Sequence, residues 1–85
     1  MVFVKSAEFQ RAYNLLPKHI QKKVKKQLFL FEQNPRHPSL SVHRLNGEWE
    51  LYVDIHYRCL FRWKGSEIEL LTIGTHKVVD RYKRK

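Results

Sequence analysis

The apolar residues of this 85-residue chain recur with a helical period in its first part and with a period of two after the middle. Four of them in the first part have the spacing of one helix face: Phe9, Ala12, Tyr13 and Leu16. Ser6, a residue type that caps helix N-termini, precedes them and follows a short apolar strand at residues 2–5. Pro17 ends this helix and opens a second one over residues 17–33, because a first turn does not need its missing N–H. So short a joint predicts two antiparallel helices.

The loop at residues 34–41 contains two prolines that disfavour regular structure, and the segments after it alternate. Expected strands lie at residues 41–45, 49–54, 53–63 and 68–74, with turns at Asn46-Gly47 and at residues 64–67. The apolar run at residues 68–74 is typical of a strand buried on both faces. The order of elements predicts one α+β domain over residues 1–85, with two N-terminal antiparallel helices packed on one face of a small antiparallel β-sheet.

Alternation along residues 53–63 divides this strand into an apolar side and a polar side. The apolar side carries Tyr57, Cys59, Phe61 and Trp63, and the other side carries His56, Arg58, Leu60 and Arg62. If the apolar side packs under the helices, the imidazole and the guanidinium groups face solvent or a partner. That uncovered face is the candidate site.

Seventeen Lys and Arg against eight Asp and Glu give a formal charge of +9 and a pI near 10.0, which favours a polyanionic partner such as nucleic acid. A solvated basic surface or an acidic partner protein would also account for this charge. The chain starts without a basic leader or a long apolar run, so we expect no signal peptide, no membrane span and a cytoplasmic location. The single cysteine, Cys59, excludes a disulfide scaffold and is expected in the core.

Four histidines lie in or beside loops and strand ends: His37, His43, His56 and His76. Metal-free RNA cleavage needs a base for the 2′-hydroxyl proton, cations for the charged transition state and an acid for the departing oxygen, which His and Arg can supply. Simpler interpretations remain open for each residue. His37 is then a loop residue, His43 caps the turn at residues 44–47, and His56 is a turn residue. Asp54 is as well suited to anchoring Arg58 or a histidine as to acting as a base. No metal-ligand spacing and no cofactor motif is present.

Five short motifs follow one another along nearly the entire chain: "LP" between the helices, "NPRHPSL" in the loop, "RLNG" at the turn, "YR" in a strand and the closing "IGTH". In this order and spacing they resemble the RelE/ParE superfamily of bacterial toxin–antitoxin modules. The resemblance implies two N-terminal helices against an antiparallel sheet. Most enzymatic members cut mRNA on the ribosome without a metal, whereas ParE-type members inhibit DNA gyrase.

The resemblance also implies roles for individual residues. The histidines and the aspartate of the YafQ-like branch correspond to His43, Asp54 with His56, and His76, and the phosphate-binding arginine and the tyrosine of the RelE-like branch correspond to Arg58 and Tyr82. The chain differs from the RelE-like branch at Glu50 and Tyr52, where that branch has lysines, and from the YafQ-like branch at Asp80, where that branch has an aromatic residue. The stretch "WELYVDIHYRCLFRW" is also similar to the strand pair of HigB-type ribonucleases.

The sequence therefore predicts a toxin that cleaves mRNA on the ribosome, with the 2′-hydroxyl attacking the phosphodiester and no metal or cofactor. Predicted catalytic residues are His76, Arg58, His56, His43, Asp54 and Tyr82; predicted RNA-binding residues are Lys22, Lys25, Lys26, Arg62, Arg81, Lys83, Arg84 and Lys85. Expected partners are a cognate antitoxin, the ribosome at the 30S A site and mRNA, with no membrane. Alternatives are a ParE-like gyrase inhibitor without enzymatic activity, an inactive basic RNA-binding protein, and a retained fold without toxicity.

Overall fold

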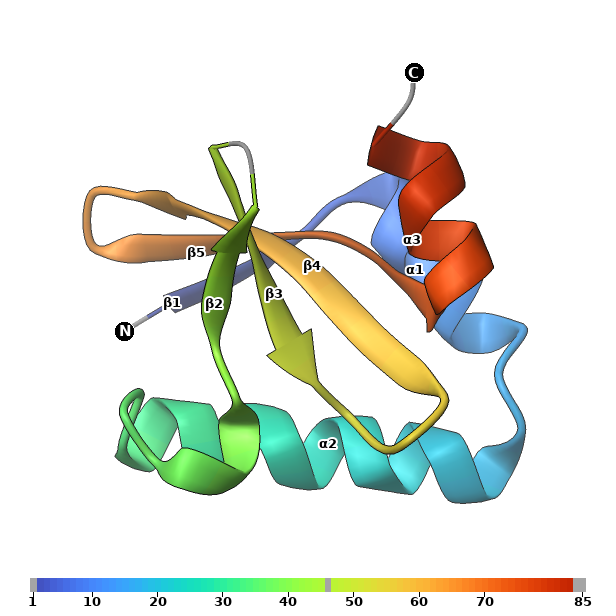
Figure 1. Ribbon diagram of the computed structural model, residues 1–85, viewed down its shortest axis with the longest axis horizontal. Coiled ribbons are helices and arrows are strands. Elements are labelled where there is room, and N and C mark those ends of the chain that lie inside the picture. Colours follow the sequence, from blue (N-terminus) through green and yellow to red (C-terminus); the bar gives the residue numbers. More distant parts are fainter. Residues whose placement is uncertain (1, 46, 84–85) are drawn as a thin grey trace.

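A computed structural model describes residues 2–45 and 47–83 as three helices and a short 3₁₀ turn around one five-stranded sheet (Figure 1). The elements are β1 (Val2–Lys5), α1 (Ala7–Asn14), α2 (Lys18–Gln33), the 3₁₀ turn η1 (Pro38–Leu40), β2 (His43–Leu45), β3 (Glu48–Tyr52), β4 (Tyr57–Lys64), β5 (Glu67–Thr75) and α3 (His76–Lys83). The strand order is β1-β5-β4-β3-β2, in which β1 pairs in parallel with β5 and all other pairs are antiparallel. The predicted α+β class is confirmed.

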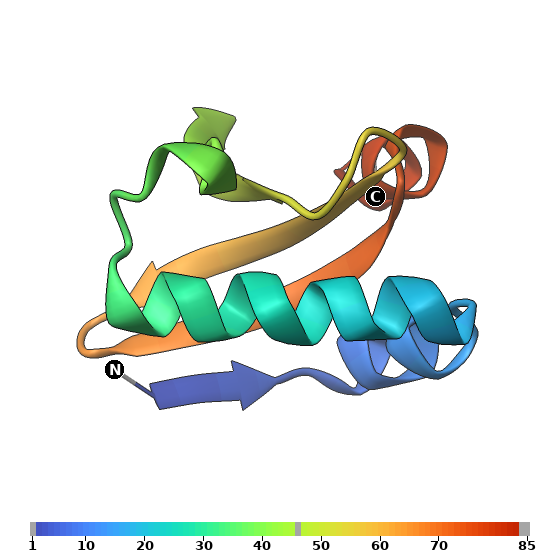
Figure 2. The same cartoon turned by 90° about the horizontal axis from the view of Figure 1, so that it is seen from below.

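Both predicted helix starts are present. The Ser6 hydroxyl oxygen accepts a hydrogen bond from the Phe9 N–H at 3.0 Å, and the Pro17 carbonyl accepts from the N–H groups of Ile20 and Gln21 at 3.0 Å each. The chain turns sharply between α1 and α2. As a result, α2 alone spans the width of the sheet, and α1 lies at the N-terminal end of α2 (Figures 1 and 2). The sheet face packed against α2 is called the inner face below.

The main core lies between α2 and the inner face. Ile20, Val24 and Phe31 of α2 are buried in one cluster with Leu51 and Cys59, among other strand residues. Burial raises the pKa of the Cys59 thiol to about 12, because the thiolate would be without its hydration there. The prediction of Cys59 as a core residue is confirmed.

The strand predicted at residues 53–63 is wrong at its start, because β4 begins only at Tyr57 and residues 53–56 form the turn that follows β3. The Asp54 carboxylate accepts hydrogen bonds from the N–H groups of His56 at 2.8 Å and Tyr57 at 3.0 Å, an Asx-type turn that ends the ladder. His56 therefore lies in a turn and not on a sheet face. Further along β4 the predicted alternation holds, with Cys59 on the inner face and Leu60 on the opposite, outer face.

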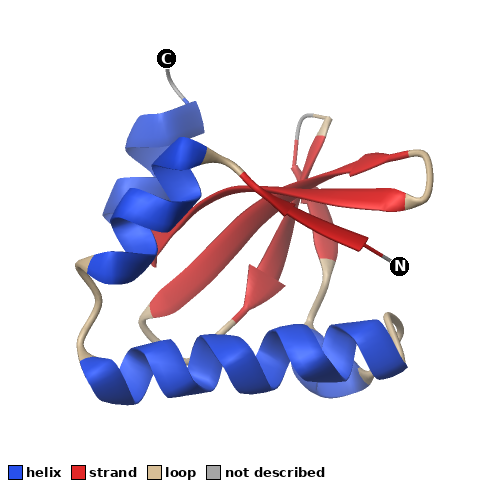
Figure 3. Cartoon of the chain, turned by 180° about the vertical axis from the view of Figure 1, so that it is seen from behind, coloured by secondary structure: helices blue, strands red, loops and turns tan. Residues whose placement is uncertain are grey.

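Residues His76–Lys83 form the helix α3, which covers part of the outer face. Leu60, Leu71 and Val79 are buried together there, with Tyr82 packed against them. A register shift in the β4–β5 pairing leaves Leu71 without a partner in β4. Leu70 is buried on the inner face and Leu71 on the outer face. This confirms that residues 68–74 are buried on both faces. Figure 3 shows α1 and α3 together at the end of the sheet where α2 begins.

Within the described ranges, 2–45 and 47–83, no helix is long and apolar enough to cross a membrane.

Candidate functional site

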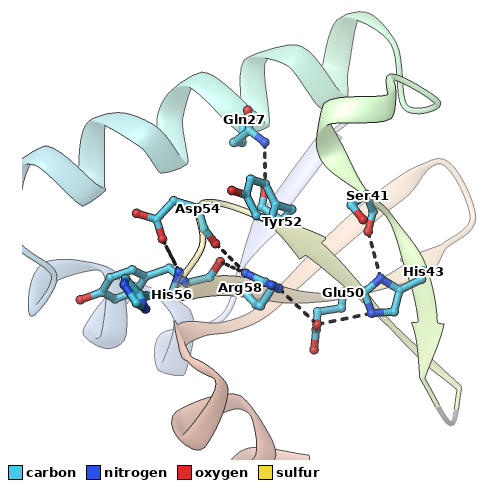
Figure 4. Close-up of polar contacts among 9 residues, drawn as sticks. Gln27, Ser41, His43, Glu50, Tyr52, Asp54, His56 and Arg58 are labelled. Atoms are coloured by element: carbon cyan, nitrogen blue, oxygen red, sulfur yellow. Dashed lines mark hydrogen bonds and ion pairs between the residues drawn. The ribbon is translucent and has the colours of Figure 1, made fainter.

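Three strands bring His43, Glu50 and Arg58 together on the outer face (Figure 4). His43 of β2 is paired directly with Glu50 of β3, and Arg58 of β4 is paired with Tyr52, two residues along β3. Since alternate residues of a strand share a face, Glu50 and Tyr52 point to the same side as both partners. The two predicted site residues His43 and Arg58 are thus joined through Glu50, a residue at which the chain departs from the family pattern.

Glu50 lies between the two basic groups. Its Oε1 is 3.4 Å from Nε2 of His43 and 3.7 Å from Nε of Arg58. The Glu50 side chain is only 7% exposed, against 48% for His43 and 18% for Arg58. A buried carboxylate is stable only with charged or hydrogen-bonding partners, so these contacts explain how the sheet accommodates it. We name His43, Glu50 and Arg58 the outer-face cluster.

The His43 ring is held at both nitrogens. Nδ1 lies 2.9 Å from the Ser41 carbonyl oxygen, and because a carbonyl can only accept, Nδ1 is the donor. The contact of Nε2 with Glu50 is attractive when Nε2 also carries a proton. The backbone hydrogen bond of the ring is made to Ser41, which has a left-handed backbone at φ 46° and precedes His43, and residue 46 of the turn that His43 would cap lies outside the described residues.

The Arg58 guanidinium is held from three sides. Its Nη1 donates to the carbonyl oxygens of Asp54 at 2.6 Å and Tyr57 at 3.0 Å, and its carbon lies 5.0 Å from the centre of the Tyr52 ring. Glu50 approaches Nε. The mid-sheet arginine is therefore paired and largely enclosed, and what it can offer a ligand is the small exposed part of its side chain.

Asp54 holds the turn between β3 and β4. Besides its two backbone hydrogen bonds, its Oδ2 lies 3.3 Å from the Lys23 ammonium of α2. Partial burial raises the pKa of Asp54, but the hydrogen bonds from the His56 N–H, the Lys23 ammonium and the Tyr57 N–H outweigh it and bring the pKa below 3.8. Asp54 is thus ionised at neutral pH. Its backbone carbonyl accepts from Arg58 and its carboxylate accepts from the N–H groups of the turn, so these contacts favour Asp54 as an anchor of Arg58 over Asp54 as a catalytic base.

His56 and His76 emerge at the same end of the strand pair β4–β5. Tyr57 is paired with Thr75 and Arg58 with Gly74, so the turn bearing His56 faces the start of α3 at His76. Both histidines are exposed. Arg58 is the second residue of β4 from this end, and its partner Gly74 precedes His76 by two residues. The strand pairing thus places His56, His76 and Arg58 near one end of β4–β5, whereas His43 lies two strands away from β4 and is paired with Glu50 at the level of Leu60.

The remaining predicted residues lie elsewhere. Tyr82 packs against Leu60, Leu71 and Val79, and it lines a hollow of about 110 Å³ with Glu8, Thr72, Val78 and Arg81. Arg62 is paired with Glu48 at 3.3 Å and with Glu69 at 3.2 Å. Arg81 is exposed on α3. Arg84, Lys85 and the side chain of Lys83 lie outside the described residues.

Lys22, Lys25 and Lys26, named the α2 lysines below, are exposed on the helix that covers the inner face. Lys26 lines a hollow with Tyr52 and Asp54, beside the end of β3, whereas Lys25 lines a different hollow with Phe9 and Tyr13 of α1. The acids Glu48, Glu50 and Glu69 pair with the arginines of β4, so the basic surplus of the chain is not concentrated on the outer face.

Two supporting residues were missed by the sequence analysis. Glu50 could have been found from the alternation of β3, had its register with β4 been known. Gln27 is a buried amide of α2 whose Nε2 donates to the carbonyls of Tyr52 at 2.8 Å and Ser39 at 3.3 Å, which fixes the end of β3 to α2 (Figure 4). Its only sequence signal is a glutamine within an apolar helix face.

Among the described residues, no group of three or more His, Cys, Asp and Glu side chains is arranged to hold a metal ion.

Comparison with known proteins identifies the fold. No protein-family model and no curated protein sequence matches the chain. Among solved structures, YafQ from E. coli strain BL21(DE3) superposes with a TM-score of 0.77 at 18% identity, over 91% of this chain and 94% of YafQ. A YoeB/ParE toxin from Agrobacterium tumefaciens gives 0.76 at 16% identity, over 89% and 99% of the two chains. The RelE–RelB complex of Pyrococcus horikoshii OT3 gives 0.72 at 18% identity, over 87% and 92%.

These observations define the protein as a small α+β protein with the fold of the RelE/ParE toxin superfamily. It shares its fold with YafQ and RelE, as the sequence motifs predicted, and also with the YoeB/ParE toxin.

Proposed function

We propose that this protein is the toxin of a toxin–antitoxin pair and acts as an endoribonuclease on ribosome-bound mRNA. The observation that carries the proposal is the position of Arg58, which contacts Glu50 beside His43 and lies near the end of β4–β5 where the exposed His56 and His76 emerge, outside the core under α2. Likeness of fold to YafQ and RelE supports it.

The roles follow from chemistry. His76 or His56 exchanges the 2′-hydroxyl and leaving-group protons, because an imidazole can both accept and donate a proton. His43 is the counterpart on the other side of Arg58. The exposed part of Arg58 stabilises the negative charge that develops on the phosphate. Tyr82 lies on the neighbouring α3, and the α2 lysines and Arg81 provide basic contacts to ribosomal RNA.

A cognate antitoxin is the proposed protein partner. YafQ and RelE have been solved as the DinJ–YafQ and RelE–RelB complexes. The formal charge of +9 suits an acidic partner segment. We place the action of the protein in the cytoplasm, where ribosomes and mRNA are found.

The test replaces Arg58 and His76 separately with alanine and measures mRNA cleavage on programmed ribosomes by primer extension. Each substitution is expected to lower cleavage about 100-fold or more, the usual contribution of a proton-transfer group or of one donor to a developing anion. His19→Ala is the matched control, because His19 is exposed on α2 and has no proposed role. Unchanged cleavage in both site variants would place the active site elsewhere.

The alternative of a gyrase inhibitor without enzymatic activity is favoured by one observation. Arg58 is only 18% exposed and its Nη1 bonds to two backbone carbonyls, as expected of a structural arginine. A DNA supercoiling assay run beside the translation assay separates the two functions. Inhibition of supercoiling with intact mRNA would support the alternative.

A further inference from the structure

We propose that Glu50 is a positioning residue, which holds His43 and Arg58 in one fixed arrangement on the outer face. The consequence for cleavage rests on the proposed function, whereas the positioning itself does not.

The strand order places Glu50 between the two basic groups. β3 lies between β2 and β4, and Glu50 reaches His43 on one side and Arg58 on the other with the same oxygen, Oε1. A carboxylate shared by an arginine and a protonated histidine fixes their separation, because movement of either group away from it weakens the attraction. Long, flexible side chains such as arginine gain most from such an anchor.

Glu50 acts through its neighbours and does not itself reach a substrate. Its side chain is 7% exposed, whereas His43 is 48% exposed. Each neighbour has its second anchor in the backbone: His43 binds the Ser41 carbonyl, and Arg58 binds the carbonyls of Asp54 and Tyr57. Glu50 completes both sets. Without it, the imidazole is held at Nδ1 alone and the Nε side of the guanidinium is no longer oriented.

The charge of Glu50 has a separate effect. The Glu50 carboxylate cancels one positive charge on the face that is proposed to bind phosphate. Its presence therefore weakens the electrostatic attraction of this face for RNA, while it improves the orientation of His43 and Arg58. The two effects have opposite signs in a Glu50→Gln variant, which keeps the shape and removes the charge. Such a variant should bind RNA at least as tightly as the wild type and cleave it more slowly. A merely structural role would not produce this division.

The experiment compares the wild type with Glu50→Gln and with the control Glu48→Gln. Glu48 lies on the same face of β3 and is paired with Arg62, away from His43 and Arg58. Single-turnover cleavage of ribosome-bound mRNA gives the rate and the apparent affinity, and ¹⁵N NMR follows the Arg58 Nε–H and the His43 ring nitrogens. Glu50→Gln should cleave about 10- to 100-fold more slowly without loss of affinity, as expected for small misplacement of reacting groups. In the Glu50→Gln variant the Arg58 Nε–H should exchange faster with water. Glu48→Gln should change neither the cleavage rate nor the exchange of the Arg58 Nε–H.

Glu50→Asp provides a second variant if Glu50→Gln does not fold. It keeps the charge but withdraws the carboxylate from contacts that are already 3.4 and 3.7 Å long, so the same NMR changes are expected. Unchanged Arg58 and His43 signals in the folded variant would overturn the proposal. If the signals change while the wild type cleaves no mRNA, the positioning stands and the proposed ribonuclease function fails.

Discussion

Gly74 of β5 is the position at which one added methyl group should separate α3 from the sheet. A Cβ at residue 74 would lie 2.7 Å from Cγ1 and 2.8 Å from Cβ of Val78. The backbone of Gly74 is not in the left-handed region, so the cost of Gly74→Ala is steric and not conformational. Rotation of the Val78 side chain cannot relieve the contact, because its Cβ is fixed by the helix backbone. The helix itself must move.

The magnitude follows from overpacking. Forcing one extra methyl group into a closely packed contact costs about 1–3 kcal/mol, and in a domain of this size each kcal/mol lowers Tm by about 4–8 °C. Movement of α3 would also loosen the packing of Val79 against Leu60 and Leu71, which places the effect toward the upper part of that range. His76 and Tyr82 move with the same helix, so cleavage should fall as well if the proposed site is correct.

Urea unfolding followed by circular dichroism measures the effect, in a double-mutant cycle with Val78→Ala. Removal of the two Cγ atoms takes away part of the clash, so Gly74→Ala should cost less in the Val78→Ala background. Gly65→Ala is the control: its Cβ meets nothing within 4 Å, but its φ of +62° imposes a backbone cost of about 1–2 kcal/mol that Val78→Ala should not change. Strict additivity of Gly74→Ala and Val78→Ala, or wild-type stability of Gly74→Ala, would refute the steric account.

Three further predictions concern titration and charge. Cys59, whose pKa is raised to about 12, should resist alkylation by iodoacetamide at pH 8 in the folded protein and react after unfolding in urea. Mass spectrometry measures the extent of alkylation, and rapid labelling of the native protein would contradict the burial of Cys59. Because the pKa of Asp54 is lowered on folding, the ionised carboxylate stabilises the protein above its ordinary value of 3.8, so Asp54→Ala should be less stable than the wild type at pH 7. That difference should shrink as the pH falls below 3.8 and through the lowered pKa, and a difference that stays constant over the whole acid titration would show another cause. Replacement of the α2 lysines with alanine should weaken RNA binding. The slope of log K against log salt should fall in magnitude by about 0.7–0.9 for each phosphate that is no longer neutralised. An unchanged slope would mean that the α2 lysines do not bind RNA.

The sequence determined the elements and the side that each residue takes. Ser6 and Pro17 mark helix starts through local hydrogen bonds and a fixed φ, and both act as the sequence predicts. Alternation placed Cys59 and Leu60 on opposite faces, because consecutive side chains of a strand point to opposite sides. The motifs added the fold of the superfamily. These properties depend on neighbours within a few residues, which the sequence displays directly.

The tertiary structure alone decided which of these residues meet. The alternating pattern predicts a strand that continues through residues 53–56, but the chain turns at Asp54 because its carboxylate accepts hydrogen bonds from two backbone N–H groups of the turn. α3 covers part of a face expected to be bare, because Val79 is buried there against Leu60 and Leu71. Glu50 joins His43 to Arg58 through strand register, and register depends on pairings between distant segments that no local pattern specifies.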